Sequence, residues 1–175
     1  MGFSETEVRK MFQYYQDSSM LIGDVEAMIA GMKPWYDNYC FARMSLNDDR
    51  VFNCDMTLYY LSSQVQKHRA PEDMVDKNIR TDYSKLKMLA RIDHDGSHEG
   101  SRMSTIEEIA AKGEILVNLH TSFPAEKVAD IDNFRSLLYY YGLLTMCGTR
   151  GDLIRMCIPN HCVREQYFGF LRDYY

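Results

Sequence analysis

Residues 134–168, FRSLLYYYGLLTMCGTRGDLIRMCIPNHCVREQYF, decide the fold of this chain. The stretch opens with apolar side chains at helical spacing: Phe134, Leu137, Leu138 and Tyr141. This pattern predicts an amphipathic helix, and Asp132 is placed to be its N-cap. Two β-prone runs, 143–147 and 153–158, flank a Gly-Thr-Arg-Gly-Asp turn and predict a hairpin. Pro159 and the asparagine after it then begin a final helix.

The segment before this stretch predicts a helix and a strand. The order Ser-Thr-Ile-Glu at 104–107 is a capping box, and the helix that it begins ends at Gly113, a residue favoured just past a helix C-terminus. Residues 114–119 predict a short strand, and Pro124 begins a short helix to about 129. The order helix, strand, helix, helix, hairpin, helix predicts a winged helix. The inward residues expected in its last helix are Val163, Tyr167, Phe170, Leu171 and Tyr174.

The first half of the chain predicts three helices and an irregular hairpin. Ser4-Glu5-Thr6-Glu7 is a capping box before a helix, and a second helix is expected over 20–32, with Ile22 inward and Pro34 after its end. Residues 35–54 predict the hairpin. Asp55 is the expected cap of a third helix to about Lys67. The side chains expected to be buried in the third helix are Leu58, Leu61 and Val65.

Beyond this helix the pattern is weaker. Residues 69–80 predict an extended crossover, residues 81–93 a further helix, and 94–101 a polar loop. The fold class is therefore mainly α with a small β component (α+β). It consists of a helical lid-like domain, 1–102, with the hairpin near 35–54, followed by a winged-helix domain, 103–175.

Composition limits the class of protein. The chain has 175 residues, 46% of them hydrophobic, and a net charge of −5, so it can form a packed core but lacks the basic surface of a nucleic-acid-coating protein. It contains no apolar run of about 20 residues, and its N-terminus does not resemble a signal peptide. The five cysteines form no CxxC pair, which favours reduced thiols in the cytoplasm. They are Cys40, Cys54, Cys147, Cys157 and Cys162.

Catalytic motifs are weak in this sequence. Asp93, His94, Asp95, His98 and Glu99 are metal-ligand residue types, but their spacing matches neither a zinc site nor an EF-hand, so a solvated loop is favoured.

The other residues that could be catalytic are better explained by structural roles. His68, His120 and His161 each stand alone, and Cys162 follows His161 at a helix start, where packing or capping is favoured over a reactive thiol. The sequence has no GxxxxGK(S/T) loop for a nucleotide phosphate.

The predicted winged helix has the wrong charge for reading DNA. Its second helix-turn-helix element carries one basic residue, Arg135, and its wing carries Arg150. Between Ser104 and Pro159 there are five Lys or Arg against seven Asp or Glu. This balance favours a winged helix that contacts protein.

Several segments resemble a known family, the bacterial AAA-ATPase-like domain proteins, which often carry a PD-(D/E)XK nuclease-like domain. GFSETEVRKMFQYY is similar to the family's GFTExEV helix, KPWYDNYCF to its WYNGYRF motif, and RVFNCDMTLYYL to VYNPWSxxxxL. MVDKNIRTDYSKLKML and the 134–168 stretch resemble later parts of the family. Asn38 and Cys40 replace the family's Gly and Arg, and Cys54-Asp55 replaces its Pro-Trp.

The resemblance implies what kind of part this chain is. The family's P-loop and magnesium site precede GFTExEV and its nuclease-like domain follows the RDYY region, so we expect a lid and winged-helix part cut from a longer protein. It also implies no cofactor in this chain, with ATP and Mg²⁺ bound only by the missing upstream core. The family-motif positions, expected to be structural, are Trp35, Tyr36, Tyr39, Phe41, Asn53, Asn78, Arg80, Asp82, Tyr83, Pro159 and Asn160.

Three functional hypotheses follow. The first is a non-catalytic module of an AAA-ATPase-like protein that contacts the ATPase core, a nuclease-like domain or other proteins, with self-association through apolar surface near Tyr174-Tyr175. The second is a nucleic-acid-binding winged helix. The third, the least supported, is a metal-dependent enzyme built on His94, Asp95 and His98. The aromatic cluster 35–41 is expected to be core, with a stacking platform for bases as the alternative.

Overall fold

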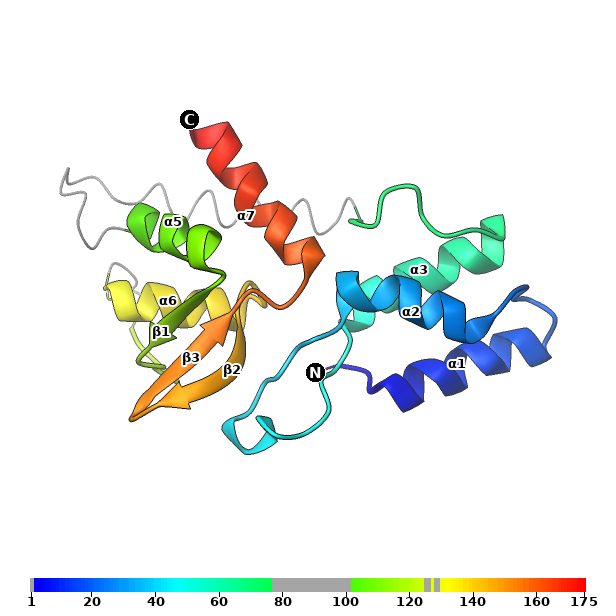
Figure 1. Cartoon of the computed structure of the whole chain (residues 1–175), viewed down its shortest axis with the longest axis horizontal. Helices are drawn as coiled ribbons and strands as arrows, with labels where there is room; N and C mark the ends of the chain where they lie inside the picture. The colour runs from blue at the N-terminus through cyan, green and yellow to red at the C-terminus, as the bar shows by residue number, and fades with distance from the viewer. Residues whose placement is uncertain (1, 77–101, 125–126, 128–129) are drawn as a thin grey trace. The chain divides into compact units, whose positions relative to one another are not determined.

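The chain forms two compact units, shown in Figure 1, a computed structural model that describes residues 2–76, 102–124, 127 and 130–175. The first unit comprises Met1–Lys77 and the short segment Asn160–Cys162; the second comprises Asn78–Pro159 and Val163–Tyr175. The fold is mainly helical α+β, as predicted, with a three-stranded antiparallel sheet near the C-terminus. The predicted boundary at 102 adjoins residues that the structure does not describe and stays a prediction.

None of the helices in the described ranges is long and apolar enough to cross a membrane.

The first unit is a three-helix cluster of α1 (Glu5–Asp17), α2 (Val25–Tyr36) and α3 (Cys54–Lys67). The predicted capping box of α1 is confirmed: the Ser4 hydroxyl accepts from the Glu7 amide at 3.3 Å, and the Glu7 carboxylate accepts from the Ser4 amide at 2.8 Å. The helices meet around fully buried side chains, because each helix has one apolar stripe. These are Val8, Phe12, Met32 and Tyr36.

The second helix differs from its prediction. It begins after Asp24, whose carboxylate accepts from the Glu26 amide at 3.0 Å, and it continues through Pro34 to Tyr36. Ile22, expected to point inward, lies before the helix and is 64% exposed. Burial of the Tyr36 ring in the helical register outweighs the backbone hydrogen bond that Pro34 cannot make in the last turns.

The predicted hairpin is irregular, as expected. Antiparallel bridges join Tyr39 to Val51 and Phe3 to Phe52, and a 3-10 turn covers Arg43–Ser45. The cap of α3 is Asn53, whose side chain accepts from the Met56 amide at 3.1 Å, and not Asp55.

The buried face of α3 is also shifted from the prediction. Leu61 is buried as predicted, but Val65 is only half-buried and Leu58 is 46% exposed. The inward face instead includes Met56 and Tyr60, because the helix packs on α1 and α2 through its more aromatic side.

The described part of the second unit has the order helix, strand, helix, hairpin, helix, which is compatible with the predicted winged helix. It contains α5 (Arg102–Lys112), β1 (Glu114–Val117), α6 (Ile131–Tyr140), β2 (Thr145–Arg150), β3 (Leu153–Cys157) and α7 (His161–Tyr174), whose first two residues group with the first unit. All strand pairs are antiparallel and the sheet order is β1-β3-β2, so β2 and β3 form the wing hairpin (Figure 1). The short helix predicted after Pro124 lies mostly outside the described residues.

Three details of the second unit correct the prediction. Ser104 is not a cap, because α5 already includes Arg102, which is 1% exposed and lies over the Phe134 ring at 5.4 Å. The cap of α6 is Asp130 and not Asp132. Tyr141, predicted on the apolar stripe of α6, and Tyr174, predicted to point inward, are 51% and 58% exposed.

Candidate functional site

Four of the family-motif residues gather in the first unit. Tyr36 is fully buried, and Tyr39, 5% exposed, forms hydrogen bonds with the side chains of Asn53 and Asn160. The Asn160 amide also donates to the backbone oxygen of Asp37 at 3.0 Å, although 123 positions separate the two residues. The segment Asn160–Cys162 is therefore fixed to the first unit by buried polar contacts.

Aromatic contacts complete this cluster. Trp35 meets the His161 ring edge-on, with centroids 5.5 Å apart, and Phe41 stacks on Tyr39 at 5.5 Å. Tyr36 and Tyr39 are core side chains, in agreement with the expected packing role, whereas Phe41 is 40% exposed. The cluster offers one exposed ring and therefore no row of stacking surfaces for successive bases.

Burial governs the titration of these phenols. Desolvation raises the pKa of Tyr39 to about 12, and hydrogen bonds with Asn160 and Asn53 limit the rise. The pKa of Tyr36 is raised further, first by burial and then by the nearby Cys162 thiol. Both hydroxyls stay protonated near neutral pH and act as hydrogen-bond groups, not as bases.

Asp37 is a feature that the sequence analysis missed. It is 7% exposed, its Oδ1 atom has no hydrogen-bond partner among the residues that the structure describes, and the Lys33 ammonium lies 3.8 Å from Oδ2. Burial is the largest influence and raises the pKa of this carboxyl, while the Asn38 amide and Lys33 act in the opposite direction. A polar residue between Tyr36 and Asn38 gave no pattern from which its burial could be predicted.

The remaining motif positions carry less information. Pro159 is buried in the second unit, just before α7. Asn78, Arg80, Asp82 and Tyr83 lie outside the described residues.

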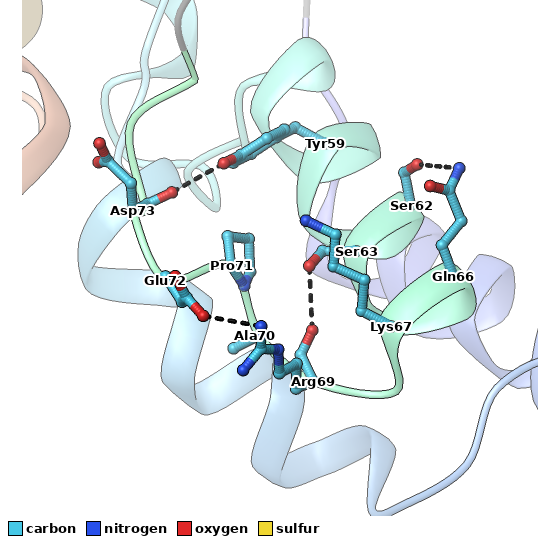
Figure 2. Close-up of a pocket in the computed structure, with 10 residues that line it drawn as sticks. All are labelled: Tyr59, Ser62, Ser63, Gln66, Lys67, Arg69, Ala70, Pro71, Glu72 and Asp73. Carbon is cyan, nitrogen blue, oxygen red and sulfur yellow. Dashed lines mark hydrogen bonds and ion pairs between the residues drawn. The ribbon is translucent and has the colours of Figure 1, made fainter.

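A pocket of about 430 Å³ lies on the first unit between α3 and the segment 69–73, which folds back along the helix (Figure 2). Hydroxyls hold this returning segment: Ser63 donates to the Arg69 backbone oxygen at 3.1 Å and Tyr59 donates to that of Asp73 at 2.8 Å. Just beyond the pocket, the buried Tyr36 hydroxyl donates to the Met74 oxygen at 2.7 Å. We call Arg69–Met74 the strap.

Local contacts hold the strap that forms one wall of the pocket. Arg69 and Glu72 pair at 2.7 Å, and the Asp73 carboxylate accepts from the Val75 amide at 3.1 Å. The two serine hydroxyls in its lining take part in local hydrogen bonds: Ser63 donates to the Arg69 oxygen, and Ser62 accepts from the Gln66 amide at 3.1 Å. His68 lies at the end of α3 with φ 53°, where it caps the helix, as expected for a structural histidine.

In the second unit, α6 has little free surface. Asn133, Phe134, Ser136, Leu138 and Tyr139 are buried. Arg135, the basic residue on which a DNA contact would depend, is largely buried and lies 3.7 Å from the Asp132 carboxylate.

His120 is held by a chain of amides. The Asn133 side chain donates to the Lys127 oxygen at 2.8 Å, so its own oxygen accepts from His120 Nδ1 at 2.5 Å. His120 Nε2 then accepts from the Asn118 amide at 3.3 Å. This order fixes the tautomer of His120 and gives it a packing role, as expected. The inward spacing of Asn133 before Leu137 was the one signal in the sequence for this buried amide.

The described ranges contain no group of three or more His, Cys, Asp or Glu side chains that could hold a metal ion. The candidate metal loop, residues 93–99, lies outside those ranges, so the metal hypothesis stays a prediction. The five cysteines all lie in the described ranges, and no disulfide joins any two of them.

Comparisons of this chain with family models, with curated proteins and with solved structures find no match.

Proposed function

We propose that this chain is a non-catalytic helical-lid and winged-helix module of an AAA-ATPase-like protein, and that it works through contacts with other protein surfaces. The observation that carries the proposal is the low exposure of the side chains of α6. In a DNA-reading winged helix this element presents polar side chains to the major groove. Here Tyr140 is the one exposed side chain of α6, and Arg135 is paired with Asp132.

The hairpin supports the family part of the proposal. Position 38, where the family motif has glycine, has φ 81°, a backbone conformation that favours glycine and that asparagine tolerates better than most residues. Position 40, where the family has arginine, is a buried cysteine whose Sγ donates to the Ala42 oxygen at 3.3 Å. Loss of that arginine fits a member that has lost a polar contact of its relatives.

The contacts of the Asn160–Cys162 segment support a role in joining domains. The segment Asn160–Cys162 belongs to the first unit and is held there by contacts of Asn160 with Asp37 and of His161 with Trp35. A module that passes a conformational change between neighbours needs such a fixed attachment point.

Calorimetry with Mg²⁺-ATP tests the non-catalytic part. We expect no heat of binding at micromolar concentrations, because the chain has no phosphate-binding loop. Binding with micromolar or tighter affinity would contradict the proposal.

A mobility-shift titration with duplex DNA at increasing salt tests the alternative, a nucleic-acid-binding winged helix. Phosphate contacts give binding that falls steeply with salt, by a log-log slope of about −0.9 per phosphate. We expect no salt-dependent shift, and a steep slope would favour the alternative. Metal analysis of the purified protein, with His94→Ala as the control, tests the metal-dependent enzyme.

A further inference from the structure

The face of the sheet that carries Arg155 has a groove of about 580 Å³. The register places Arg155 opposite Leu116 on one side and Gly148 on the other, and places Arg150 opposite Leu153. Since side chains alternate across a strand, these residues share a face, whereas the buried Ile154 and Met156 occupy the other. We call the groove on the Arg155 face the outer-face groove.

Glycine at position 148 makes room for the guanidinium. A Cβ atom there would lie 3.1 Å from Nη2 and 3.2 Å from Nε of Arg155. The guanidinium lies across β2 and donates to the Cys147 oxygen at 3.3 Å, which limits the freedom of the side chain. Arg155 is therefore positioned before any partner arrives, and this lowers the entropic cost of using it.

Arg150 and Arg155 have N–H donors available for a ligand. The contact between Arg155 and Glu114 is long, 3.9 Å, and both side chains are about half exposed, so it is weak. Arg150 has no ion pair with any residue in the described part of the chain. By contrast, Lys112 at the rim of the groove is paired with Glu108 at 2.8 Å. Each guanidinium has five N–H donors in a planar fork that matches a carboxylate or a phosphate.

The acidic residues in the groove decide between these two ligands. Glu108 and Glu114 line it beside the arginines. A nucleic acid carries a charge at every phosphate and would place some of them against these glutamates. A peptide can place carboxylates on the arginines and apolar side chains on Leu116, which lines the groove. Leu153 is 37% exposed and adds apolar surface on the same face of the sheet, although it does not line the groove.

We propose that the outer-face groove binds an extended protein segment that carries acidic and apolar side chains, with Arg150 and Arg155 receiving its carboxylates. This proposal rests on the proposed function, since it names the surface and the chemistry of one of the protein contacts. Arg155 is the positioned receptor, and Arg150 adds a second positive charge from the β2–β3 hairpin.

Fluorescence anisotropy with a short labelled peptide of aspartate and leucine tests the proposal. We expect weak binding that the same peptide with asparagine for aspartate does not show. The double variant Arg150→Ala/Arg155→Ala is expected to lose about tenfold in affinity, because both guanidinium contacts with the peptide carboxylates are removed. Arg172→Ala, an exposed arginine of α7 in the same unit, is the matched control and is expected to bind as the parent does.

A variant that is expected to raise the affinity keeps the test valid if the double variant misfolds. Glu114→Gln removes the carboxylate that competes for Arg155, so we expect it to bind the acidic peptide more tightly. Equal binding of the aspartate and asparagine peptides, or no effect of Glu114→Gln and of the double variant, overturns the proposal.

Short duplex DNA in the same assay distinguishes failure of the groove proposal from failure of the proposed function. Failure of the peptide to bind, with no DNA binding either, removes the groove proposal and leaves the proposed function in place. Salt-dependent DNA binding that is lost in the double variant overturns both.

Discussion

The contribution of each strap hydrogen bond to stability can be measured by removing one tyrosine hydroxyl at a time. Tyr36 and Tyr59 each donate to a strap carbonyl, at 2.7 and 2.8 Å, but the Tyr36 side chain is fully buried whereas the Tyr59 contact is exposed. Tyr36→Phe keeps the ring, and with it the edge-on contact with Tyr60, and deletes only the donor. Tyr59→Phe makes the same chemical change where water can replace the lost partner.

The structure sets the expected magnitudes. A protein hydrogen bond contributes about 1 kcal/mol net, and a carbonyl left partly buried without a donor adds to the loss. Met74 is half-buried, so we expect Tyr36→Phe to lower the free energy of unfolding of the first unit by about 1.5 kcal/mol. This is about a tenfold change in the unfolding constant. Tyr59→Phe is expected to cost less than about 0.5 kcal/mol, because both groups are rehydrated.

Trp35 provides the assay. It is the single tryptophan of the chain and lies in the first unit against His161, so its fluorescence follows the unfolding of that unit in urea. With a slope of about 1 kcal/mol per molar urea, Tyr36→Phe should move the midpoint by more than about 1 M. Equal losses in the two variants would refute the reasoning, because burial would then not decide the contribution of the hydroxyl.

Three further predictions concern single polar residues. Asn38→Gly should leave the first unit as stable or more stable, whereas Asn38→Ala should lower its stability by about 1 kcal/mol, because φ is 81°; Trp35 fluorescence in urea measures both. Asp37→Asn should stabilise the first unit at pH 7. The folded state holds the Asp37 proton more tightly than the unfolded state does, so the penalty of the charged form arises as pH rises through the raised pKa and vanishes below the ordinary value. The gain should therefore shrink on acidification, and a constant gain from pH 7 to pH 4 would contradict this cause. Asn133→Ala should cost the second unit about 1–3 kcal/mol in a thermal melt followed by far-UV circular dichroism, because it leaves His120 Nδ1 and the Lys127 oxygen without partners.

Sequence patterns predicted local structure correctly where the two interacting residues lie within one helical turn of each other. The Ser4–Glu7 capping box formed as predicted, because both hydrogen bonds close within three residues. Gly113 and Gly151, at the predicted helix end and wing turn, have φ of 75° and 61°, which glycine adopts without strain. The similar box at 104–107 failed, since packing of Arg102 on Phe134 extended the helix past it.

Of the candidate site, the sequence predicted the packing role of the aromatic cluster but not its polar partners. Tyr36 and Tyr39 were expected in a core because aromatic side chains dominate burial. The partner of Tyr39, Asn160, could not be predicted, since hydrogen bonds between distant segments leave no periodic pattern in the chain.

The sequence by itself therefore determined the mainly helical α+β class and the order of the described helices and strands near the C-terminus, because periodicity and turn residues act over a few positions. Only the tertiary structure decided which polar groups are buried and paired. It placed the Asn160 amide on the Asp37 backbone oxygen, buried the Asp37 carboxylate, and placed the Arg155 guanidinium against Gly148. These contacts depend on the meeting of segments far apart in the chain, and their energies depend on the burial that this meeting creates.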